Sequence, residues 1–405
     1  MRTGPRNRRL AGGVIAVIAA VALLASSCGD SKSDSGSSSG DSSAKPATLA
    51  KIGKGEGELA IIAWAGYAEN GSTSPDYDWV TPFEKESGCK VTVKVGNTSD
   101  EMVELMRSGD YDGVSASGNA SQRLIEAGDV SPVNTDLLTN YPDVAPFLKN
   151  ADYNSKDGQM YGMPHGWGAN LLQYNADVVS PAPDSWGVVY DAKSPQAGKI
   201  TAYDDWTTIA DAAVYLKSAQ PELKIDNPYA LDQKQFDAAV QLLKDQKPLI
   251  AEYWSDYLKY EEAVTKGSIT LGTTWQIITN TLTAQTPPVN VKAVLPKEGS
   301  TAWSDTWMLS SKAKHPNCMY PWMNWISKPD IQAQVAEYFG EAPANLKACD
   351  LTTDKDFCTT FHAGDEAYAN ELYYWTVPTE KCLDGSDRTC VGFKKWVEAW
   401  TEVKG

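Results

Sequence analysis

Strand-like and helix-like segments alternate along most of this chain. Residues 59–64 form a continuous apolar run, and residues 90–95 alternate apolar and polar side chains with a period of two. Residues 99–109 follow with apolar side chains at helical spacing, with Ser99 as the expected N-cap and Gly109 as the expected stop. Strands that alternate with helices predict an α/β architecture with mostly parallel sheets flanked by helices.

The length of the alternating region sets the number of cores. Residues 57–405 are too many for one ordinary hydrophobic core and enough for two. Further strand candidates at residues 269–272 and 289–294 extend the alternation into the second half of the chain. We find no short internal repeat, which argues against a solenoid. The sequence therefore predicts two α/β lobes.

The first fifty residues have the composition of an export signal followed by a tether. Four arginines precede an apolar run, residues 10–25, that is too short and too poorly flanked for a stable membrane span. Small residues then lead to Cys28, as in a lipobox. We predict a signal peptide at residues 1–27, lipid attachment at Cys28 and a Ser/Gly-rich flexible tether at residues 28–56. An uncleaved signal anchor is the alternative, which the tether composition disfavours.

Export and charge together restrict the partners. A lipid on Cys28 would hold the protein on the outer face of the cytoplasmic membrane, and this anchor would be its only membrane contact. Removal of residues 1–27, which carry four Arg and no acid, takes the formal charge from −16 to −20. That acidity argues against nucleic acid and anionic membrane surfaces as partners, and it agrees with a cationic ligand.

Six cysteines remain once Cys28 is assigned to the lipid. An even number of cysteines in an exported protein predicts disulfides. Four of the six can pair so that each bond closes a short loop, and the other two are then left for each other. The predicted bonds are Cys89–Cys318, Cys349–Cys358 and Cys382–Cys390.

The sequence contains no catalytic motif that we recognise. It has no G-x-S-x-G elbow, no phosphate-binding Gly-rich loop and no C-x-x-C pair, and its three histidines are scattered. We therefore expect no enzymatic activity, no metal and no cofactor. Aromatic residues instead recur beside acids and amides at the ends of expected strands. These segments are residues 64–67, 117–119, 203–206, 274–276 and 303–305.

This combination suits an alkylamine. A protonated amine in a water-poor cleft needs carboxylates to accept its hydrogen bonds. Aromatic ring faces attract the cation and cover its carbon chain. The residues alone thus favour a site for a small organic cation.

The order of these segments resembles the polyamine (spermidine/putrescine) binding family of ABC-transporter receptors. The resemblance covers nearly the whole mature chain, and its most specific piece is the segment Pro296-Lys297-Glu298-Gly299 followed by Trp303-Ser304-Asp305. The other matching segments are Trp64 with Tyr67, Pro82–Val91, Tyr111–Val114, Tyr161–Asn170, Gly198–Asp205 and Asp330–Asn345.

The resemblance implies a Venus-flytrap fold, in which two lobes close on the ligand as a monomer that an ABC permease recognises. Residues 57–168 with 302–348 would form one lobe, and residues 169–301 with 349–405 the other. By position, the aromatic walls would be Trp64, Tyr67, Trp275 and Trp303, and the amine-binding acids would be Asp205 and Asp305.

Three positions depart from the family pattern. Gly66 replaces an acid, Asn119 replaces an aromatic residue and Thr208 replaces a further acid, while residues 68–78 form an insertion. We still expect Asn119 and Thr208 to line the site. Fewer acids predict a ligand with fewer amines, within the putrescine/spermidine class.

Other interpretations of the same residues remain open. Asp205 precedes an expected helix and could be only its N-cap. Any single Trp among fourteen could be a core residue. The same receptor architecture could bind another solute, such as an amino acid-like amine, a quaternary ammonium compound or a sugar. A secreted enzyme on a similar scaffold is a more distant alternative, which would need a nucleophile–base pair that we do not find.

Overall fold

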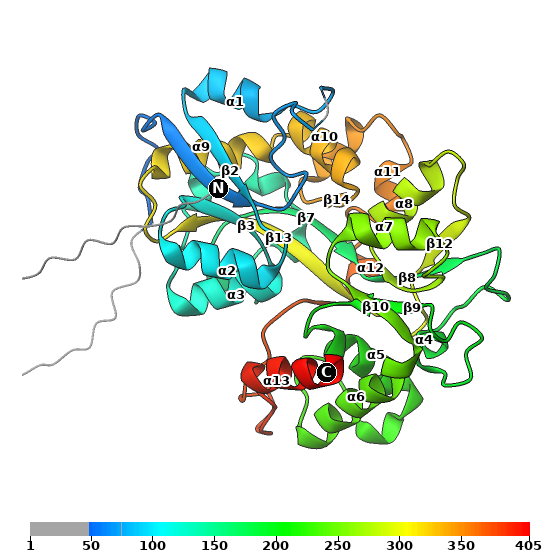
Figure 1. Ribbon diagram of the computed structural model, residues 1–405. Helices are drawn as coiled ribbons and strands as arrows, with labels where there is room; N and C mark the ends of the chain where they lie inside the picture. Colours follow the sequence, from blue (N-terminus) through cyan, green and yellow to red (C-terminus); the bar gives the residue numbers. More distant parts are fainter. Residues whose placement is uncertain (1–47, 74) are drawn as a thin grey trace, which may run out of the picture. The chain divides into compact units, whose positions relative to one another are not determined.

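The computed structural model describes residues 48–73 and 75–405 (Figure 1). The predicted signal peptide, Cys28 and most of the predicted tether lie outside these residues. Within the described part of the chain, no helix is long and apolar enough to cross a membrane.

The first sheet has eight strands, six of them in the order β14-β7-β13-β3-β1-β2, with β4 and β15 paired to β13. The strand β1 runs parallel to both β2 and β3, whereas β13 runs antiparallel to β3 and β7. Every residue of β13 is buried, as expected for a central strand covered on both faces. The strands are β1 Glu58–Ala63, β2 Lys90–Val95, β3 Gly113–Ser117, β4 Val130–Ser131, β7 Met163–Ala169, β13 Ser300–Ser310, β14 Ala342–Pro343 and β15 Leu372–Tyr374.

The second sheet has five strands in the order β10-β9-β11-β8-β12. Strands β10, β9 and β11 are parallel, and β8 is antiparallel to β11 and β12. The strands are β8 Leu171–Asn175, β9 Ile200–Tyr203, β10 Ile250–Trp254, β11 Leu271–Thr274 and β12 Val291–Val294. A separate hairpin consists of β5 Ser155–Lys156 and β6 Gln159–Met160. The predicted α/β class is confirmed, but the sheets are mixed rather than mostly parallel, because β13 and β8 pair antiparallel with their neighbours.

Helices accompany both sheets (Figure 1). Those with side chains in the cores next to the first sheet are α1 Val80–Ser87, α2 Ser99–Ser108, α3 Gly118–Ala127, α9 Pro316–Ile326 and α10 Pro329–Phe339. Those with side chains in the core of the second are α5 Thr208–Ala219, α6 Gln233–Gln246, α7 Tyr257–Thr265, α8 Gln276–Ala284 and α13 Phe393–Lys404. The remaining short helices are α4 Gly187–Tyr190, α11 Phe357–Thr360 and α12 Glu366–Ala369, with 3₁₀ turns at Thr135–Leu137, Tyr141–Asp143, Pro146–Leu148, Pro221–Leu223, Lys247–Leu249 and Leu346–Asp350.

Helix α2 illustrates how closely local sequence determines an element. It ends at Gly109, whose φ of 76° lies in the left-handed region that favours glycine. Its N-cap is Thr98 rather than Ser99, because the Thr98 side chain accepts the hydrogen bond from the Glu101 backbone N–H. The two adjacent hydroxyl residues are both good caps, so the sequence could not separate them.

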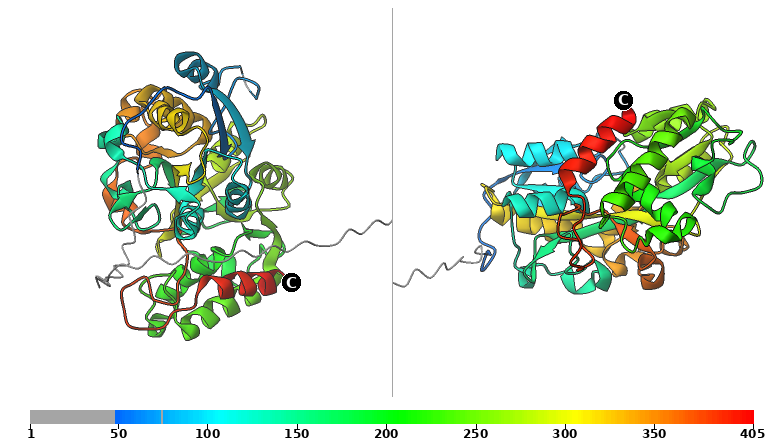
Figure 2. Two further views of the ribbon diagram at one scale, coloured as in Figure 1. Left: turned by 90° about the vertical axis from the view of Figure 1, so that its left-hand side faces the viewer. Right: turned by 90° about the horizontal axis from the view of Figure 1, so that it is seen from below.

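The chain passes between the two sheets at residues 169–171, at residues 294–300 and again after β15. Residues 361–372 contribute side chains to the core next to the first sheet, and α13 packs in the core of the second. Helix α13 lies beside α6 in both views (Figure 2). The boundaries of the two lobes given above stay a prediction.

Three disulfides join the six cysteines in the pairs expected from the sequence. They are Cys89–Cys318, Cys349–Cys358 and Cys382–Cys390. The first connects the end of the α1 region to α9 across 229 residues, and the other two close loops of nine and eight residues. The long-range bond therefore fastens helices on the first sheet, while the short ones fasten the segment that leads to α13.

Candidate ligand-binding site

A turn after β1 places Tyr67 in the interior. Trp64 follows the strand directly, and Gly66 adopts a φ of 93°, a conformation that side chains disfavour. A Cβ on Gly66 would lie 3.2 Å from the ring of Phe339 at the end of α10. The acid that the family resemblance leads one to expect at this position would therefore meet both backbone strain and a crowded neighbour.

Tyr67 binds two carboxyl groups. Its hydroxyl lies 2.7 Å from Asp305 Oδ2 on β13 and 2.7 Å from Glu341 Oε2, which follows α10. Ser117, at the end of β3, donates a hydrogen bond to the other oxygen of Asp305 at 2.5 Å. All four side chains are buried. Residues far apart in the sequence thus form one polar cluster where β1 and β3 end, beside the middle of β13 and the end of α10.

The geometry of this cluster requires a proton on one of the acids. A single Tyr hydroxyl can donate to only one carboxylate, so the second short contact needs a carboxylic acid that donates to the Tyr67 oxygen. Burial raises the pKa of Glu341 well above its usual range, and Asp305 adds to the shift. Burial also raises the pKa of Asp305, to about 6. We therefore assign the proton to Glu341 and the negative charge at neutral pH to Asp305.

His165 adds no charge to this cluster. Its Nε2 lies 3.4 Å from Glu341 Oε1, and its ring packs edge-on against Tyr67 with 4.3 Å between the ring centroids. Burial lowers the pKa of His165 to about 3. A neutral imidazole leaves Asp305 without a cation among these neighbours, so the cluster is suited to receive one.

The start of α3 brings Asn119 into the same region. The Asn119 side chain is buried, and its oxygen accepts a hydrogen bond from Ser99 of α2. The preceding Gly118 allows a close approach, because a Cβ there would lie 2.2 Å from the backbone oxygen of Trp375. The Asn119 amide nitrogen has no partner among the described residues.

Asp205 approaches the same region from the second sheet. It is half-buried just after β9, and it accepts a hydrogen bond from the Thr207 backbone N–H at 2.9 Å. Burial raises its pKa to about 6, and Asp100 and Arg123 on the helices of the first sheet also influence it. Asp205 therefore has a local role before α5, and the charges of Asp100 and Arg123 act on its carboxyl group.

Thr208 is placed differently from the other expected site residues. Its hydroxyl donates to the Tyr203 backbone oxygen at 2.7 Å, in the turn that begins α5. The side chain is buried, so this hydrogen bond already uses its donor. The structure brings Thr208 next to Asp205 but gives it a structural partner.

Aromatic side chains connect the two halves of the region. The ring of Trp275, at the start of α8, lies 6.5 Å from that of Trp303 on β13, and Trp303 lies 6.0 Å from Phe339. Tyr203 lies 5.5 Å from Trp275 and stacks on Trp375 at 5.6 Å. Tyr67, which binds Asp305, lies 4.5 Å from Phe339. A series of neighbouring rings therefore links the partner of Asp305 to Tyr203, two residues before Asp205.

Several residues of this region were missed from the sequence. Glu341 and Trp375 belong to the cluster, yet neither stood in an acid–aromatic segment of the sequence; Tyr203 stood in the segment 203–206 but was not assigned to the site. Glu341 lies in a segment that the family resemblance had matched, but only its burial against Tyr67 reveals its role. One sequence signal could have found Glu341. It is an acid that stands between Gly340 and an apolar residue, and acids in such surroundings are seldom buried unless they are paired.

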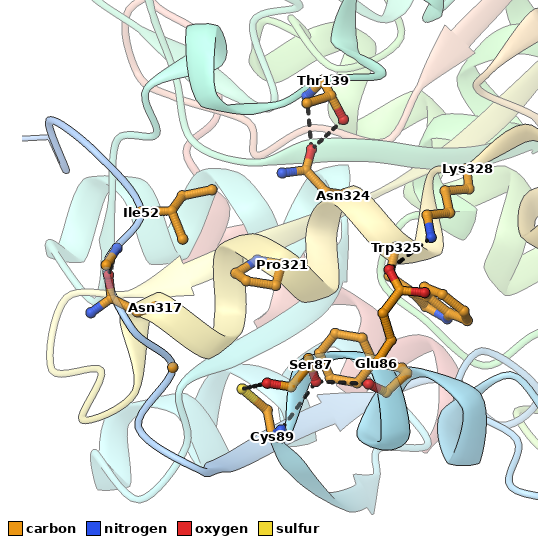
Figure 3. A pocket seen from close by; sticks show the side chains of 13 residues that line it. Ile52, Glu86, Ser87, Cys89, Thr139, Asn317, Pro321, Asn324, Trp325 and Lys328 are labelled. Atoms are coloured by element: carbon orange, nitrogen blue, oxygen red, sulfur yellow. Dashed lines mark hydrogen bonds and ion pairs between the residues drawn. The ribbon is translucent and has the colours of Figure 1, made fainter.

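One pocket lies away from this cluster and another at its edge. One, of about 380 Å³, lies between α1 and α9 (Figure 3). Its polar side chains are already paired, because Glu86 contacts Lys328 at 3.2 Å and Asn324 accepts from Thr139. The other, of about 230 Å³, borders Trp303 on the side of residues 360–368. We assign the ligand site to the acid–aromatic cluster, because there a buried carboxylate without a cation among its described neighbours lies beside aromatic rings.

Comparison with known proteins places the chain in a family. A model of bacterial extracellular solute-binding proteins matches residues 78–359, more than half of the chain. The chain belongs to this family. A curated member, the spermidine/putrescine-binding periplasmic protein of Escherichia coli K12, is 26% identical over 304 residues, which cover 72% of this chain and 83% of that protein.

Solved structures agree on the fold. The spermidine/putrescine ABC transporter substrate-binding protein PotD of Streptococcus pneumoniae superposes with a TM-score of 0.67 at 19% identity, covering 86% of this chain and 98% of its own. The periplasmic binding protein MotA of Agrobacterium tumefaciens, in complex with glucopine, gives 0.66 at 17% identity over 86% and 100%. The chain has the two-lobed fold of periplasmic binding proteins and is an extracellular solute-binding receptor.

Proposed function

We propose that this receptor serves an ABC importer and binds a small organic cation of the polyamine class between its two lobes. Asp305 accepts one ammonium group, and Asp205 accepts a second. Trp275, Trp303 and Trp64 enclose the carbon chain that joins them. Names of related proteins that bind spermidine and putrescine support this ligand class, and the residues of the site support it independently.

The observation that carries the proposal is the state of Asp305. It is a buried carboxylate that receives hydrogen bonds from two hydroxyls and lies near no cation in the described structure. A buried charge without a partner is costly, and a ligand ammonium would supply that partner. Because Glu341 is held neutral, the cluster offers one negative charge and not two. We therefore expect a diamine to bind better than a triamine.

Calorimetric titration tests this proposal directly. Putrescine, spermidine, a quaternary amine and a neutral sugar are each titrated into the wild-type protein and the Asp305→Asn variant. We expect putrescine to bind most tightly and to lose most of its affinity in the variant. Tight sugar binding that survives Asp305→Asn would refute the amine assignment and leave only the receptor role.

A ligand that also carries hydrogen-bond acceptors is the second candidate. Within the described residues, the indole N–H groups of Trp64, Trp303 and Trp375 have no partner, and neither has the Asn119 amide. Donors suit hydroxyl or carboxylate oxygens, and a fold relative is described with glucopine bound. An amino acid-like amine would combine both features, with its ammonium on Asp305 and its oxygens toward these donors.

Three further parts of the proposal concern the whole protein. We propose that it is exported and held on the outer face of the cytoplasmic membrane by a lipid on Cys28. The permease would recognise the closed arrangement of the two lobes of a monomer, whose division follows the boundaries given from the sequence. We also propose that it has no catalytic activity. The acids of its site pair with hydroxyl groups beside aromatic rings, and not with a base that could activate a nucleophile.

A further inference from the structure

The two strands that cross between the sheets are joined by a direct polar contact. Asn170 lies between β7 and β8, and Thr301 is the second residue of β13. The Asn170 backbone N–H donates to the Thr301 oxygen at 2.9 Å, and its side-chain amide donates to Thr301 Oγ1 at 2.7 Å. Any bending of one crossing strand must therefore move the other or break this pair.

This contact is the centre of a longer row of hydrogen bonds. The Trp275 indole N–H donates to Asn170 Oδ1 at 3.0 Å, and the Thr301 hydroxyl donates to the Asp211 carboxylate on α5. The direction of each hydrogen bond is fixed, because the Thr301 hydroxyl accepts from the Asn170 amide and donates to the Asp211 carboxylate. The Asn170 amide orientation is likewise fixed from both sides. Asn170, Thr301 and Asp211 are buried, so none of them can exchange its partner for bulk water.

We propose that Asn170 is a positioning residue for ligand binding. The row of hydrogen bonds fixes the position of the Trp275 indole relative to both crossing strands. Movement of these strands is therefore transmitted through Asn170 to the aromatic wall of the site. The inference rests on the proposed function, in which Trp275 contacts the ligand. Hydrogen bonds arranged head to tail polarise one another, which makes such a row stiffer than its separate bonds.

Geometry supports a role beyond folding. Trp275 lies directly before α8 and packs against Trp303, which is two residues after Thr301 on the same strand. The Asn170–Thr301 pair and the Trp275–Trp303 contact therefore meet β13 at neighbouring points, one from the β7–β8 connection and the other from the start of α8. A purely structural polar pair would not need to reach a residue of the aromatic wall.

The test uses the isosteric variant Thr301→Val, which removes the acceptor for Asn170 and the donor for Asp211. Thr201→Val is the matched control, because Thr201 is also a buried strand threonine, and its hydroxyl donates to the Glu252 backbone oxygen away from this row. The readout is the indole ¹H–¹⁵N resonance of Trp275 in the full chain, assigned with Trp275→Phe. We expect Thr301→Val to shift or broaden it and Thr201→Val to leave it in place.

Affinity for putrescine is measured on the same proteins. We expect Thr301→Val to weaken binding by about 5- to 30-fold, as for the loss of a buried hydrogen bond, and Thr201→Val to change it less than twofold. The two losses from Thr301→Val and Trp275→Phe should be less than additive in the double variant. Additive losses, or an unmoved Trp275 resonance, would overturn the proposal.

Two outcomes need separate treatment. If wild-type protein does not bind putrescine, the proposed ligand fails, while the resonance still decides whether the row exists. If Thr301→Val does not fold, hydrogen exchange of the Trp275 indole in the wild-type protein replaces it. Slow exchange supports an intact row, and exchange as fast as that of an exposed indole refutes it.

Discussion

Replacing Asp305 by Asn should weaken ligand binding and, at neutral pH, stabilise the fold. The two effects have opposite signs because the negative charge of Asp305 favours ligand binding but disfavours folding. A ligand ammonium gains from the negative charge, whereas the folded chain must bury it. Asn keeps the size and one acceptor oxygen, and the hydroxyls of Ser117 and Tyr67 can rotate to suit its amide.

The stability effect follows from the pKa of Asp305. Burial raises this pKa from the ordinary value of 3.8 to about 6. The folded chain then binds a proton more tightly than the unfolded chain, so the cost of ionising Asp305 appears as the pH rises from 4 to 6 and stays constant above. A pKa difference of about 2 corresponds to about 3 kcal/mol, an upper limit for the gain in unfolding free energy. Near pH 4 the variant and the wild type should be equally stable.

The binding effect is larger in the other direction. Loss of one partner from a desolvated charge pair typically costs about 2–5 kcal/mol, which corresponds to about 30- to 5,000-fold in affinity. Urea unfolding at pH 4 and pH 7 measures stability, and calorimetry with putrescine measures affinity. A variant that binds like the wild type, or that loses stability by more than about 1 kcal/mol at pH 7, would refute the assignment of the charge to Asp305.

Four further predictions test neighbouring groups. Glu341→Gln should leave putrescine affinity within a few-fold in calorimetry, because the amide reproduces the neutral acid beside Tyr67; a loss as large as that of Asp305→Asn would place the charge on Glu341 instead. Asp205→Asn should weaken binding by about 2 kcal/mol or more with little change in urea unfolding, whereas a fall in stability alone would reduce Asp205 to a cap. The Asp211→Asn variant should gain stability relative to the wild type as the pH rises from 4 to 7 in pH-dependent urea unfolding, because burial raises the Asp211 pKa to about 7. Cys28→Ser should release the protein from the membrane fraction in a detergent-free wash, and a variant that stays bound would exclude the lipid anchor.

The α/β class could be predicted because its signals are local. The apolar run at residues 59–64 and the period-two run at residues 90–95 became β1 and β2, paired in parallel. Helix α2 ended at the predicted glycine. The order of strands in each sheet could not be predicted, because pairing partners such as β13 and β3 are almost 200 residues apart and share no local pattern. Such contacts depend on tertiary packing.

Residues of the site could be predicted only where an acid or amide stands next to aromatic residues in the sequence. Asp305 and Trp303 stood in a conspicuous segment, and the structure brings both into the cluster. Glu341 stood alone, and its role depends on Tyr67, which comes 274 residues earlier. The protonation of the pair could not be inferred from residue types either, since it follows from one hydroxyl lying equally close to two carboxyl groups.

The two short disulfide loops flank a stretch with little regular structure that carries Trp375. This stretch crosses back over the start of α3, where Gln122 accepts hydrogen bonds from Thr376 and from the backbone of Val377. Protein produced in a reducing cytosol could therefore assemble both sheets and still leave Trp375 poorly fixed. Its apparent ligand affinity would then depend on the redox history of the sample, so thiol titration should accompany every binding measurement on recombinant material.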